Sequence, residues 1–244
     1  MQLKFNSVSF CQNGDTLLGP IDFESKIRGI TNVLGYNGAG KSLFLEMCHA
    51  MINPTSGCVY WNDNQARDTK YTRGFIFQHR VTLYRSVKKN IALPMQTAGW
   101  NNKLIADRLE ELLSMAGLES KSEEPASTLS GGEVQRMALV RALATYPKMV
   151  IMDEPTSSLD PSATTEFEKL ISQNANSGIK FLWATHNITQ AKRFADDIIF
   201  IADGKVSEIS EAKKFFNNPS STLSLIHISE PTRPRLISYA VFCL

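Results

Sequence analysis

Apolar positions along this chain follow two alternating patterns. Short, β-rich apolar runs occur at intervals, and between them apolar residues recur at steps of three and four, which is the spacing of one helix face. This alternation predicts an α/β fold in which helices cover a mainly parallel sheet. The predicted strands of this sheet are residues 30–34, 75–77, 149–152, 179–183 and 198–201, and the predicted helices between them are 43–48, 162–176 and 187–195.

The region before residue 62 has a different pattern, in which short strands are separated by turn residues. Asn13-Gly14-Asp15 and residues 53–57 carry the clearest turn signals. We therefore expect a β region of short strands at the N-terminal end of the domain. The strands predicted there are 2–5, 7–10, 20–24 and 58–61.

From about residue 81 the pattern becomes helical. Apolar residues recur at helical steps from Ile105 to Ala116, and Gly117 provides a stop signal. Since strand patterns resume at Met149, this stretch is predicted to be a helical insert, at about 81–135, within one domain.

Composition limits the possible functions. The chain has 244 residues, of which 43% are hydrophobic and 20% charged, and its formal net charge is +2. This length is sufficient for one large domain with a substantial core. The near-neutral charge argues against a nucleic-acid partner held mainly through phosphate contacts.

Several features predict a cytosolic protein. Cys11, Cys48, Cys58 and Cys243 have no C-x-x-C spacing, which indicates incidental thiols in a reducing compartment. The N-terminus enters a strand pattern without the apolar region of a signal peptide. No apolar run approaches the length of about 20 residues that a membrane helix requires.

The C-terminal stretch differs from the rest of the chain. Residues 223–233 look like the in-frame translation of a transposase-type DNA-sequencing adapter, and residues 237–244 resemble the remaining end of that adapter. We therefore expect the native domain to occupy residues 1–222 and residues 223–244 to be an assembly artefact. The alternative is a genuine Pro-containing tail.

A glycine-rich stretch from Gly35 to Ser42 fits the phosphate-loop pattern G-x-x-x-x-G-K-[ST]. A strand-like run precedes it and a helix-like run follows, so backbone N–H groups and the positive end of the helix can surround a phosphate. An ordinary glycine-rich turn is the simpler alternative. The residues expected to contact the nucleotide are Gly35, Asn37, Gly38, Ala39, Gly40, Lys41, Ser42 and Leu43.

Two carboxylates, Asp153 and Glu154, end the apolar run 149–152. In phosphate-loop enzymes the Asp of such a strand holds Mg²⁺, and a following Glu can act as the general base. Pro155 disfavours helical geometry at Glu154 and keeps this carboxylate at the end of the strand. An acidic strand-to-turn junction without catalytic function is the alternative.

Ser130 and Glu133 predict a capping box at the start of a helix. Capping does not require the two adjacent glycines, Gly131 and Gly132, but they allow backbone amides to approach an anion at the positive end of the helix. The stretch therefore predicts a second phosphate site.

Residues 129–136 resemble the signature motif of ATP-binding-cassette (ABC) ATPases, and other cassette motifs follow the family order across residues 1–216. Gln78 matches the Q-loop, Ser158-Leu159-Asp160 the D-loop, and His186 the switch histidine. One position departs from the family, because Gln12 stands where an aromatic residue usually stacks on adenine. This departure leaves the selectivity for the base open.

The resemblance implies a P-loop NTPase (RecA-like) fold, with an N-terminal antiparallel β region and a helical insert. It also implies a head-to-tail homodimer in which each ATP lies between residues 35–42 of one subunit and Ser130, Gly131 and Gly132 of the other. The catalytic residues would be Glu154, His186 and Lys41. Mg²⁺ would be organised by Ser42, Gln78 and Asp153, and Asp160 would couple the two subunits.

A cassette of this family works with an integral membrane permease, so the resemblance implies a location at the cytoplasmic face of the inner membrane. Residues 78–87, with a turn around Leu93-Pro94 nearby, would receive a helix of the permease. An extracytoplasmic solute-binding protein would be an indirect partner. We expect no nucleic-acid partner.

Finer details resemble the tungstate-import branch of the family. They include Leu43 in place of the usual Thr after Ser42, and the segments 47–49, 77–80, 83–87 and 187–191. Molybdate, phosphate and polar amino acids are alternative solutes, and lipoprotein or drug export is an alternative direction. A soluble, non-transport ABC ATPase is a further alternative, although such proteins usually carry two cassettes or a long coiled coil.

Overall fold

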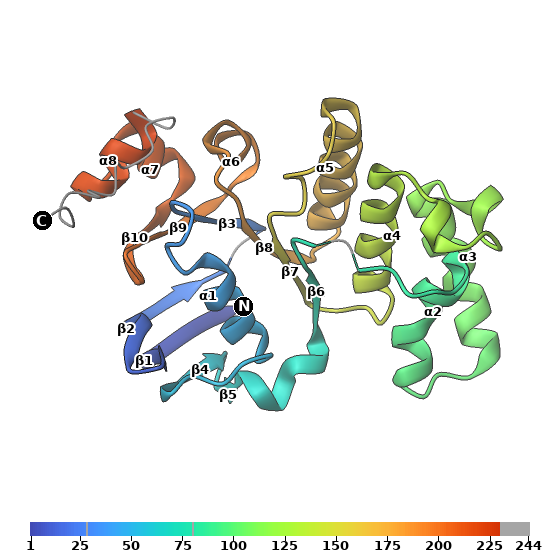
Figure 1. Cartoon of the computed structure of the whole chain (residues 1–244), viewed down its shortest axis with the longest axis horizontal. Helices are drawn as coiled ribbons and strands as arrows, with labels where there is room; N and C mark the ends of the chain where they lie inside the picture. The colour runs from blue at the N-terminus through green and yellow to red at the C-terminus, as the bar shows by residue number, and fades with distance from the viewer. Residues whose placement is uncertain (28, 80, 230–244) are drawn as a thin grey trace, which may run out of the picture.

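The computed structural model describes residues 1–27, 29–79 and 81–229 and contains two sheets and several layers of helices (Figure 1). The strands are β1 (Gln2–Gln12), β2 (Asp15–Lys26), β3 (Ile30–Leu34), β4 (Ser56–Trp61), β5 (Asn64–Gln65), β6 (Arg73–Ile76), β7 (Met149–Asp153), β8 (Lys180–Ala184), β9 (Asp197–Ala202) and β10 (Lys205–Glu211). The helices are α1 (Lys41–His49), α2 (Val87–Thr97), α3 (Asn102–Ala116), α4 (Gly131–Leu143), α5 (Pro161–Asn176), α6 (Ile188–Phe194), α7 (Ala212–Asn217) and α8 (Thr222–Ser229), with 3₁₀ turns η1 (Ala66–Thr72), η2 (Glu119–Lys121) and η3 (Ala126–Thr128).

The N-terminal sheet is antiparallel, with the strand order β2-β1-β4-β5. The prediction of two strands at 2–5 and 7–10 is wrong, because β1 is one strand with a bulge between Phe5 and Val8. Ser7 takes a φ of 47°, and its N–H donates to Asp22 Oδ1 at 2.6 Å. The extra residue brings Phe5 and Val8 to the same buried face, although residues three apart normally face opposite sides of a strand.

The larger sheet confirms the predicted parallel architecture. Its strand order is β10-β9-β3-β8-β7-β6, and only β10 pairs antiparallel with its neighbour. β8 lies between β3 and β7, and Ala184 is paired with Val33 on one side and Asp153 on the other. The carboxyl ends of these three strands therefore lie at the same edge of the sheet.

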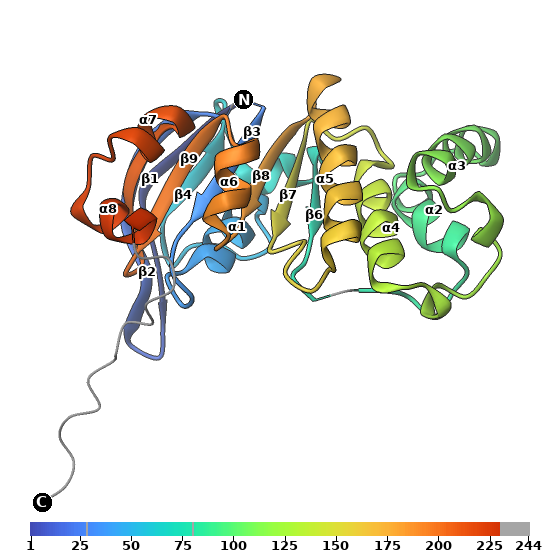
Figure 2. The same cartoon turned by 90° about the horizontal axis from the view of Figure 1, so that it is seen from above.

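Helices and the smaller sheet cover the two faces of this parallel sheet (Figure 2). On β7, Met149 and Ile151 join the core formed with α1 and the antiparallel sheet, whereas Val150 and Met152 join the core formed with α4, α5 and the insert. All four side chains are fully buried. Burial on both faces explains why the strand is apolar at consecutive positions instead of alternating.

The helical insert lies beyond β6, with α2, α3 and α4 packed together at that end of the molecule (Figure 1). The predicted helix from Ile105 to Ala116 is confirmed as α3, and Gly117 caps it with a φ of 63°. The predicted end of the insert at about 135 falls inside α4, which continues to Leu143. No helix within 1–27, 29–79 and 81–229 has the length and apolar content needed to cross a membrane.

The prediction of a turn at Leu93-Pro94 is wrong, because both residues lie inside α2. Proline lacks an N–H and so removes only one hydrogen bond from this 11-residue helix, the one to the carbonyl of Asn90. Packing of the buried residues Ile91 and Met95 against the insert core offsets that loss.

The sequence analysis did not anticipate the C-terminal elements β10, α7 and α8. The proposed boundary between native chain and artefact, at residues 222 and 223, falls at the start of α8. Leu223 and Ile228 contact a small core formed by residues of β3, α6, β9 and α7, and Ser224 is fully buried. Residues 230–244 lie outside the described part of the chain, so the assignment of an artefact stays a prediction.

The predicted capping box at the start of α4 is confirmed. The Ser130 N–H donates to Glu133 Oε2 at 2.9 Å, and the Glu133 N–H donates to Ser130 Oγ at 3.4 Å. Lys121 Nζ donates to the other oxygen of Glu133 at 2.7 Å. The hydrogen bond from Lys121, followed by that from the Ser130 N–H, lowers the pKa of Glu133 from 4.5 to about 2.

Because the pKa of Glu133 is lower in the folded state, its stabilising effect is complete above pH 4.5 and is lost as the pH falls towards 2. We predict that Glu133→Gln lowers the free energy of unfolding by about 1 kcal/mol at pH 7. Urea unfolding of both proteins should show this difference narrowing between pH 5 and pH 3. Glu110→Gln, at an exposed position of α3, is the control. A difference in the free energy of unfolding between Glu133→Gln and the wild type that stays constant from pH 5 to pH 3 would contradict the prediction.

Candidate functional site

The glycine-rich loop joins β3 to α1 at the carboxyl edge of the parallel sheet. Gly40 is the N-cap of α1 and has a φ of 99°, in the left-handed region that favours glycine. A Cβ on Gly35 would lie 2.3 Å from the carbonyl oxygen of Ile201, so the loop passes too close to β9 for a side chain. These constraints direct the loop over the N-terminus of a nine-residue helix, which is a favourable site for a phosphate.

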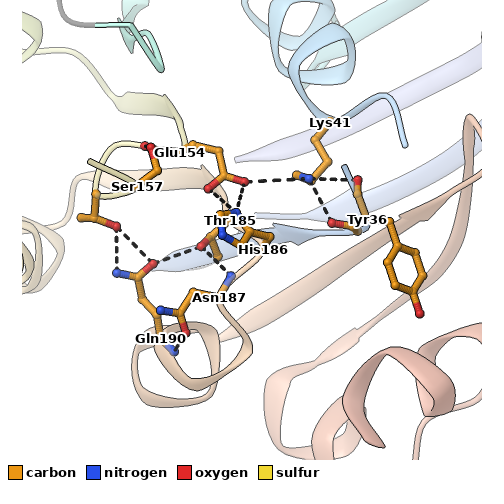
Figure 3. A network of polar contacts seen from close by, with 10 residues as sticks. Tyr36, Lys41, Glu154, Ser157, Thr185, His186, Asn187 and Gln190 are labelled. Atoms are coloured by element: carbon orange, nitrogen blue, oxygen red, sulfur yellow. Dashed lines mark hydrogen bonds and ion pairs between the residues drawn. The ribbon is translucent and has the colours of Figure 1, made fainter. Parts of the chain in front are cut away.

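Lys41 is the first residue of α1 and is buried, with 7% of its surface exposed. Its Nζ donates to the carbonyl oxygens of Gly35 at 2.9 Å and Tyr36 at 3.1 Å, and it lies 3.8 Å from Glu154 Oε1 (Figure 3). Burial lowers the pKa of Lys41, while the charges of Glu154 and Asp153 act in the opposite direction. The ammonium therefore lies between the loop and the end of β7.

Asp153 ends β7, and the Ser42 hydroxyl acts on its carboxylate to lower the pKa. Burial raises the pKa of Asp153, and the opposing effects come from Ser42, then Lys41, then His79. Oδ1 of Asp153 is buried and has no hydrogen-bond partner within the described part of the chain. A buried carboxylate oxygen that lacks a donor, next to a hydroxyl, fits a divalent cation with oxygen ligands.

No group of three or more His, Cys, Asp or Glu side chains forms a metal site among the described residues. Mg²⁺ does not require such a group, because it is usually held by one or two protein oxygens together with water and phosphate oxygens. The pair of Ser42 and Asp153 is therefore compatible with the predicted Mg²⁺ site.

Glu154 follows β7 directly and is buried, with 8% of its surface exposed. Its N–H donates to the Ala184 carbonyl at 3.0 Å, which continues the pairing of β7 with β8. Pro155 was expected to keep Glu154 out of helical geometry. The φ of Glu154 is 44°, which lies outside the right-handed helical region and in the sparsely populated left-handed region. Backbone strain of this kind is common at functional sites.

His186 completes this group from the loop after β8. Its Nδ1 lies 2.9 Å from the carboxylate of Glu154, and about half of its side chain is exposed (Figure 3). The structure thus brings together Lys41, the pair Asp153 and Glu154, and His186, which come from three segments that are far apart in the sequence. A carboxylate hydrogen-bonded to an imidazole beside a lysine is suited to activating water next to a phosphate.

Gln78 lies two residues after β6 and is exposed, and none of the described contacts joins its side chain to Asp153. Its neighbour His79 does act electrostatically on Asp153, and sequence reasoning missed this residue. The available signal was its position beside Gln78 at the end of a predicted strand. Gln12 ends β1 at an exposed position, and Arg80 lies outside the described residues.

The second predicted phosphate site lies in a separate place. Ser130, Gly131 and Gly132 line a surface cavity of about 490 Å³ together with Ser158 and Asp160, so the structure joins the two predicted motifs. The phosphate loop does not contribute to this cavity. The carboxylate of Asp160 accepts a hydrogen bond from the Ala163 N–H at 2.9 Å and thereby caps α5.

Arg136 connects this cavity to the neighbouring elements, a role that the sequence analysis did not anticipate. Its Nη1 pairs with Glu166 of α5 at 2.5 Å, and its Nε donates to the Ala116 carbonyl of α3 at 2.9 Å. Helix α4 also approaches α5 closely, because a Cβ on Gly132 would lie 2.8 Å from that of Ala163. The cavity is therefore held between the insert and the main domain.

Comparisons with known proteins agree with these observations. A family profile described as ABC transporter matches residues 18–157. The methionine import ATP-binding protein MetN of Sodalis glossinidius is 34% identical over 232 residues, covering 88% of this chain and 68% of the relative. The tungstate uptake system ATP-binding protein TupC of Peptoclostridium acidaminophilum is 34% identical over 209 residues, covering 85% of this chain and 98% of the relative.

Solved structures show the same fold. The cbiO1 protein of Clostridium perfringens, part of an ABC transporter complex, has a TM-score of 0.79 at 25% identity, covering 94% of this chain and 95% of that one. An ATP-binding cassette solved as a dimer with ADP and Pi has a TM-score of 0.76 at 26% identity, covering 86% of this chain and 98% of that one. The chain therefore belongs to the ABC transporter family and is one of its ATPases.

Proposed function

We propose that this chain energises the import of an oxyanion, tungstate, through a separate membrane permease by hydrolysing ATP. The observation that carries the ATPase part of this proposal is the contact of Glu154 with both Lys41 and His186 at the end of the glycine-rich loop. The unpartnered Oδ1 of Asp153 adds a place for the cation that accompanies a nucleotide.

Each side chain has a distinct role in this proposal. Lys41 exchanges its hydrogen bonds with the carbonyls of Gly35 and Tyr36 for bonds to phosphate oxygens, while the loop amides bind the same phosphates. Ser42 and Asp153 hold Mg²⁺, and the family resemblance adds Gln78. Bound Mg²⁺ supplies positive charge that stabilises the phosphate oxygens during transfer.

Glu154 accepts a proton from the attacking water, as a general base. The hydrogen bond between His186 Nδ1 and the Glu154 carboxylate fixes the positions of both side chains, and leaves the other side of the imidazole free to approach the γ-phosphate. The two groups thus act together at the same phosphate.

The second cavity is proposed to complete the active site of another copy of the chain. Ser130, Gly131 and Gly132 offer amides at the positive end of α4, and this cavity is separate from the phosphate loop of the same copy. A head-to-tail homodimer would place each ATP between the two surfaces. Asp160, which lines the same cavity, would link one site to the other.

An integral permease is the proposed membrane partner, and the proposed location is the cytoplasmic face of the inner membrane. The loop after β6 exposes three apolar side chains: Phe77 is 42% exposed, Val81 43% and Tyr84 fully. Arg141 of α4 donates to the Val81 carbonyl at 2.9 Å, so this loop is tied to the insert. Apolar side chains presented together in this way are suited to contacting a helix of a partner.

Tungstate is proposed as the solute, delivered by an extracytoplasmic solute-binding protein. The proposal is supported by the similarity to TupC over almost its whole length and by the short motifs at 42–43, 77–80, 83–87 and 187–191. The similarity to MetN keeps methionine import as the second candidate. Molybdate, phosphate, other polar amino acids, export and a soluble function remain alternatives. We further propose that the native domain comprises residues 1–222, with residues 223–244 as an artefact.

We predict that Glu154→Gln lowers the rate of ATP hydrolysis by at least about a hundredfold, because the general base is lost. ATP binding should persist, and gel filtration with ATP should show a stable dimer of the variant. Glu110→Gln, on the exposed face of α3, is the matched control. It should hydrolyse ATP at the wild-type rate, and gel filtration with ATP should show no stable dimer. Normal hydrolysis by Glu154→Gln would contradict the assignment of the base.

We predict that removal of divalent ions by EDTA abolishes turnover and that Mg²⁺ restores it. Asp153→Asn should raise the Mg²⁺ concentration needed for half-maximal turnover by about tenfold or more, because a ligand with a full negative charge is lost. Mn²⁺ binding in the presence of ATP, followed by electron paramagnetic resonance, provides a second readout. Equal Mn²⁺ affinity of the wild type and Asp153→Asn would contradict the site, and Asp107→Asn serves as the control.

The solute is tested by reconstituting the chain in proteoliposomes with the permease and the solute-binding protein encoded by neighbouring genes. We predict that ATP turnover rises when tungstate is added with the binding protein, and that methionine has no such effect. Stimulation by methionine and not by tungstate would replace tungstate with the second candidate. Glu154→Gln in the same vesicles controls for ATP turnover that does not come from this chain.

A further inference from the structure

Gln190 lies beneath the two loops that carry Glu154 and His186 (Figure 3). It belongs to the first turn of α6 and is buried, with 3% of its surface exposed. Its backbone N–H is bonded to the side chain of Asn187, the N-cap of α6, at 3.0 Å. The side-chain amide is therefore directed away from solvent and into the contact between neighbouring segments.

The amide of Gln190 joins two loops and a helix. Its Oε1 accepts a hydrogen bond from the Thr185 hydroxyl at 3.1 Å, and its Nε2 donates to the Thr156 hydroxyl at 3.0 Å and to Glu168 Oε1 at 2.7 Å. Both amide hydrogens are thus used. Thr185 directly precedes His186, and Thr156 lies two residues after Glu154, so one side chain contacts both loops next to their reacting groups.

The third contact anchors this amide to α5. Glu168 is buried, with 3% of its surface exposed, and Arg193 Nη2 donates to both of its oxygens at 2.9 and 2.8 Å. Helix α5 begins directly after Asp160, which lines the proposed dimer cavity. The network therefore connects the catalytic loops to the helix that starts at the proposed subunit interface.

We propose that Gln190 is a positioning residue for ATP hydrolysis, which holds His186 and Glu154 at hydrogen-bonding distance and links them to α5. This inference rests on the proposed role of the Glu154 and His186 pair. The Thr185 hydroxyl also accepts the Asn187 N–H at 3.1 Å, so the turn that carries His186 is fixed from both sides. Buried polar networks whose members are all satisfied impose one geometry, which a catalytic pair requires.

The charge and chemistry of the amide explain why other side chains do not suffice. Glutamate at position 190 would place a second carboxylate against Glu168 and would offer no N–H to it. Methionine has a similar size, but it would leave the hydroxyls of Thr156 and Thr185 and the carboxylate of Glu168 without this partner. An exchange of Gln190 and Glu168 would restore an amide facing a carboxylate at the same contact.

The test measures steady-state ATP hydrolysis by wild type, Gln190→Met, Gln190→Glu and the double variant Glu168→Gln/Gln190→Glu. We predict that each single variant lowers kcat by about tenfold or more while KM for ATP changes less than about threefold, because misplacement of catalytic groups affects the transition state more than binding. The double variant should recover most of the kcat lost in Gln190→Glu. Gln173→Met, at an exposed position of α5, is the control and should match the wild type.

The resonance of the His186 ring, assigned with His186→Asn, gives a readout that does not require turnover. The single variants should shift it at constant pH, and the double variant should return it towards the wild-type position. Unchanged kcat and an unchanged ring resonance in Gln190→Met would overturn the proposal. Thermal stability and kcat could instead fall together, to the same extent in both single variants and the double variant. Such a result would also overturn the proposal and would show that Gln190 only stabilises the fold.

The outcomes separate this proposal from the proposed function. Absence of ATP hydrolysis by the wild type, together with the expected shifts of the His186 ring, would contradict the ATPase assignment of the site but support the conclusion that Gln190 positions His186. Hydrolysis by the wild type, with no effect of the Gln190 substitutions on kcat or on the His186 ring, would support the ATPase assignment and contradict the positioning role of Gln190.

Discussion

The parallel pairing of β3, β8 and β7 determines where the chemistry of this protein takes place. Ala184 is in register with Val33 and Asp153, so the chain leaves three adjacent strands at the same edge of the sheet. The loop after β3 is the proposed phosphate site, β7 ends at Asp153 with Glu154 directly after it, and the loop after β8 carries His186. Burial of both faces of these strands restrains their movement, and chemistry is therefore confined to the loops at their ends.

The charges at this edge depend on one another. Burial of an isolated charge is costly, and here it lowers the pKa of Lys41 and raises that of Asp153. The carboxylates of Glu154 and Asp153 offset part of this cost for Lys41, and Lys41 offsets part of it for Asp153. Oδ1 of Asp153 still lacks a donor, and Lys41 uses backbone carbonyls as acceptors. In the proposed mechanism, Oδ1 of Asp153 would contact a cation, and Lys41 would exchange its backbone acceptors for phosphate oxygens.

A second group of residues lies on the other side of β7, around the start of α4 and α5. These residues are proposed to complete the ATP site of another copy of the chain, but contacts within their own copy determine their position. Arg136 ties α4 to α3 and α5, and Gln190 ties α5 to the loops beside Glu154 and His186. Helix α5 is therefore the element that physically connects the proposed subunit interface with the proposed catalytic pair, Glu154 and His186.

The sequence by itself determined the strand and helix pattern of the parallel sheet, because strands buried on both faces are apolar without interruption. It also determined the glycine-rich loop, the pair Asp153 and Glu154, and the capping box at Ser130, because each depends on a short local spacing. Local sequence patterns predicted strand and helix boundaries less reliably where packing against residues far along the chain determined the backbone conformation. The bulge at Ser7 serves the burial of Phe5 and Val8, and Pro94 is kept inside α2 by the insert core.

Only the tertiary structure decided which side chains meet. The sequence did not show that His79 acts on Asp153 or that Gln190 contacts Thr156 and Glu168, since these partners lie tens of residues away. The separation of the Ser130 cavity from Lys41 was implied by the family resemblance, but no spacing in the sequence showed it. Spacing along a chain specifies local geometry, whereas contacts between buried polar groups depend on strand order and register, which distant segments set together.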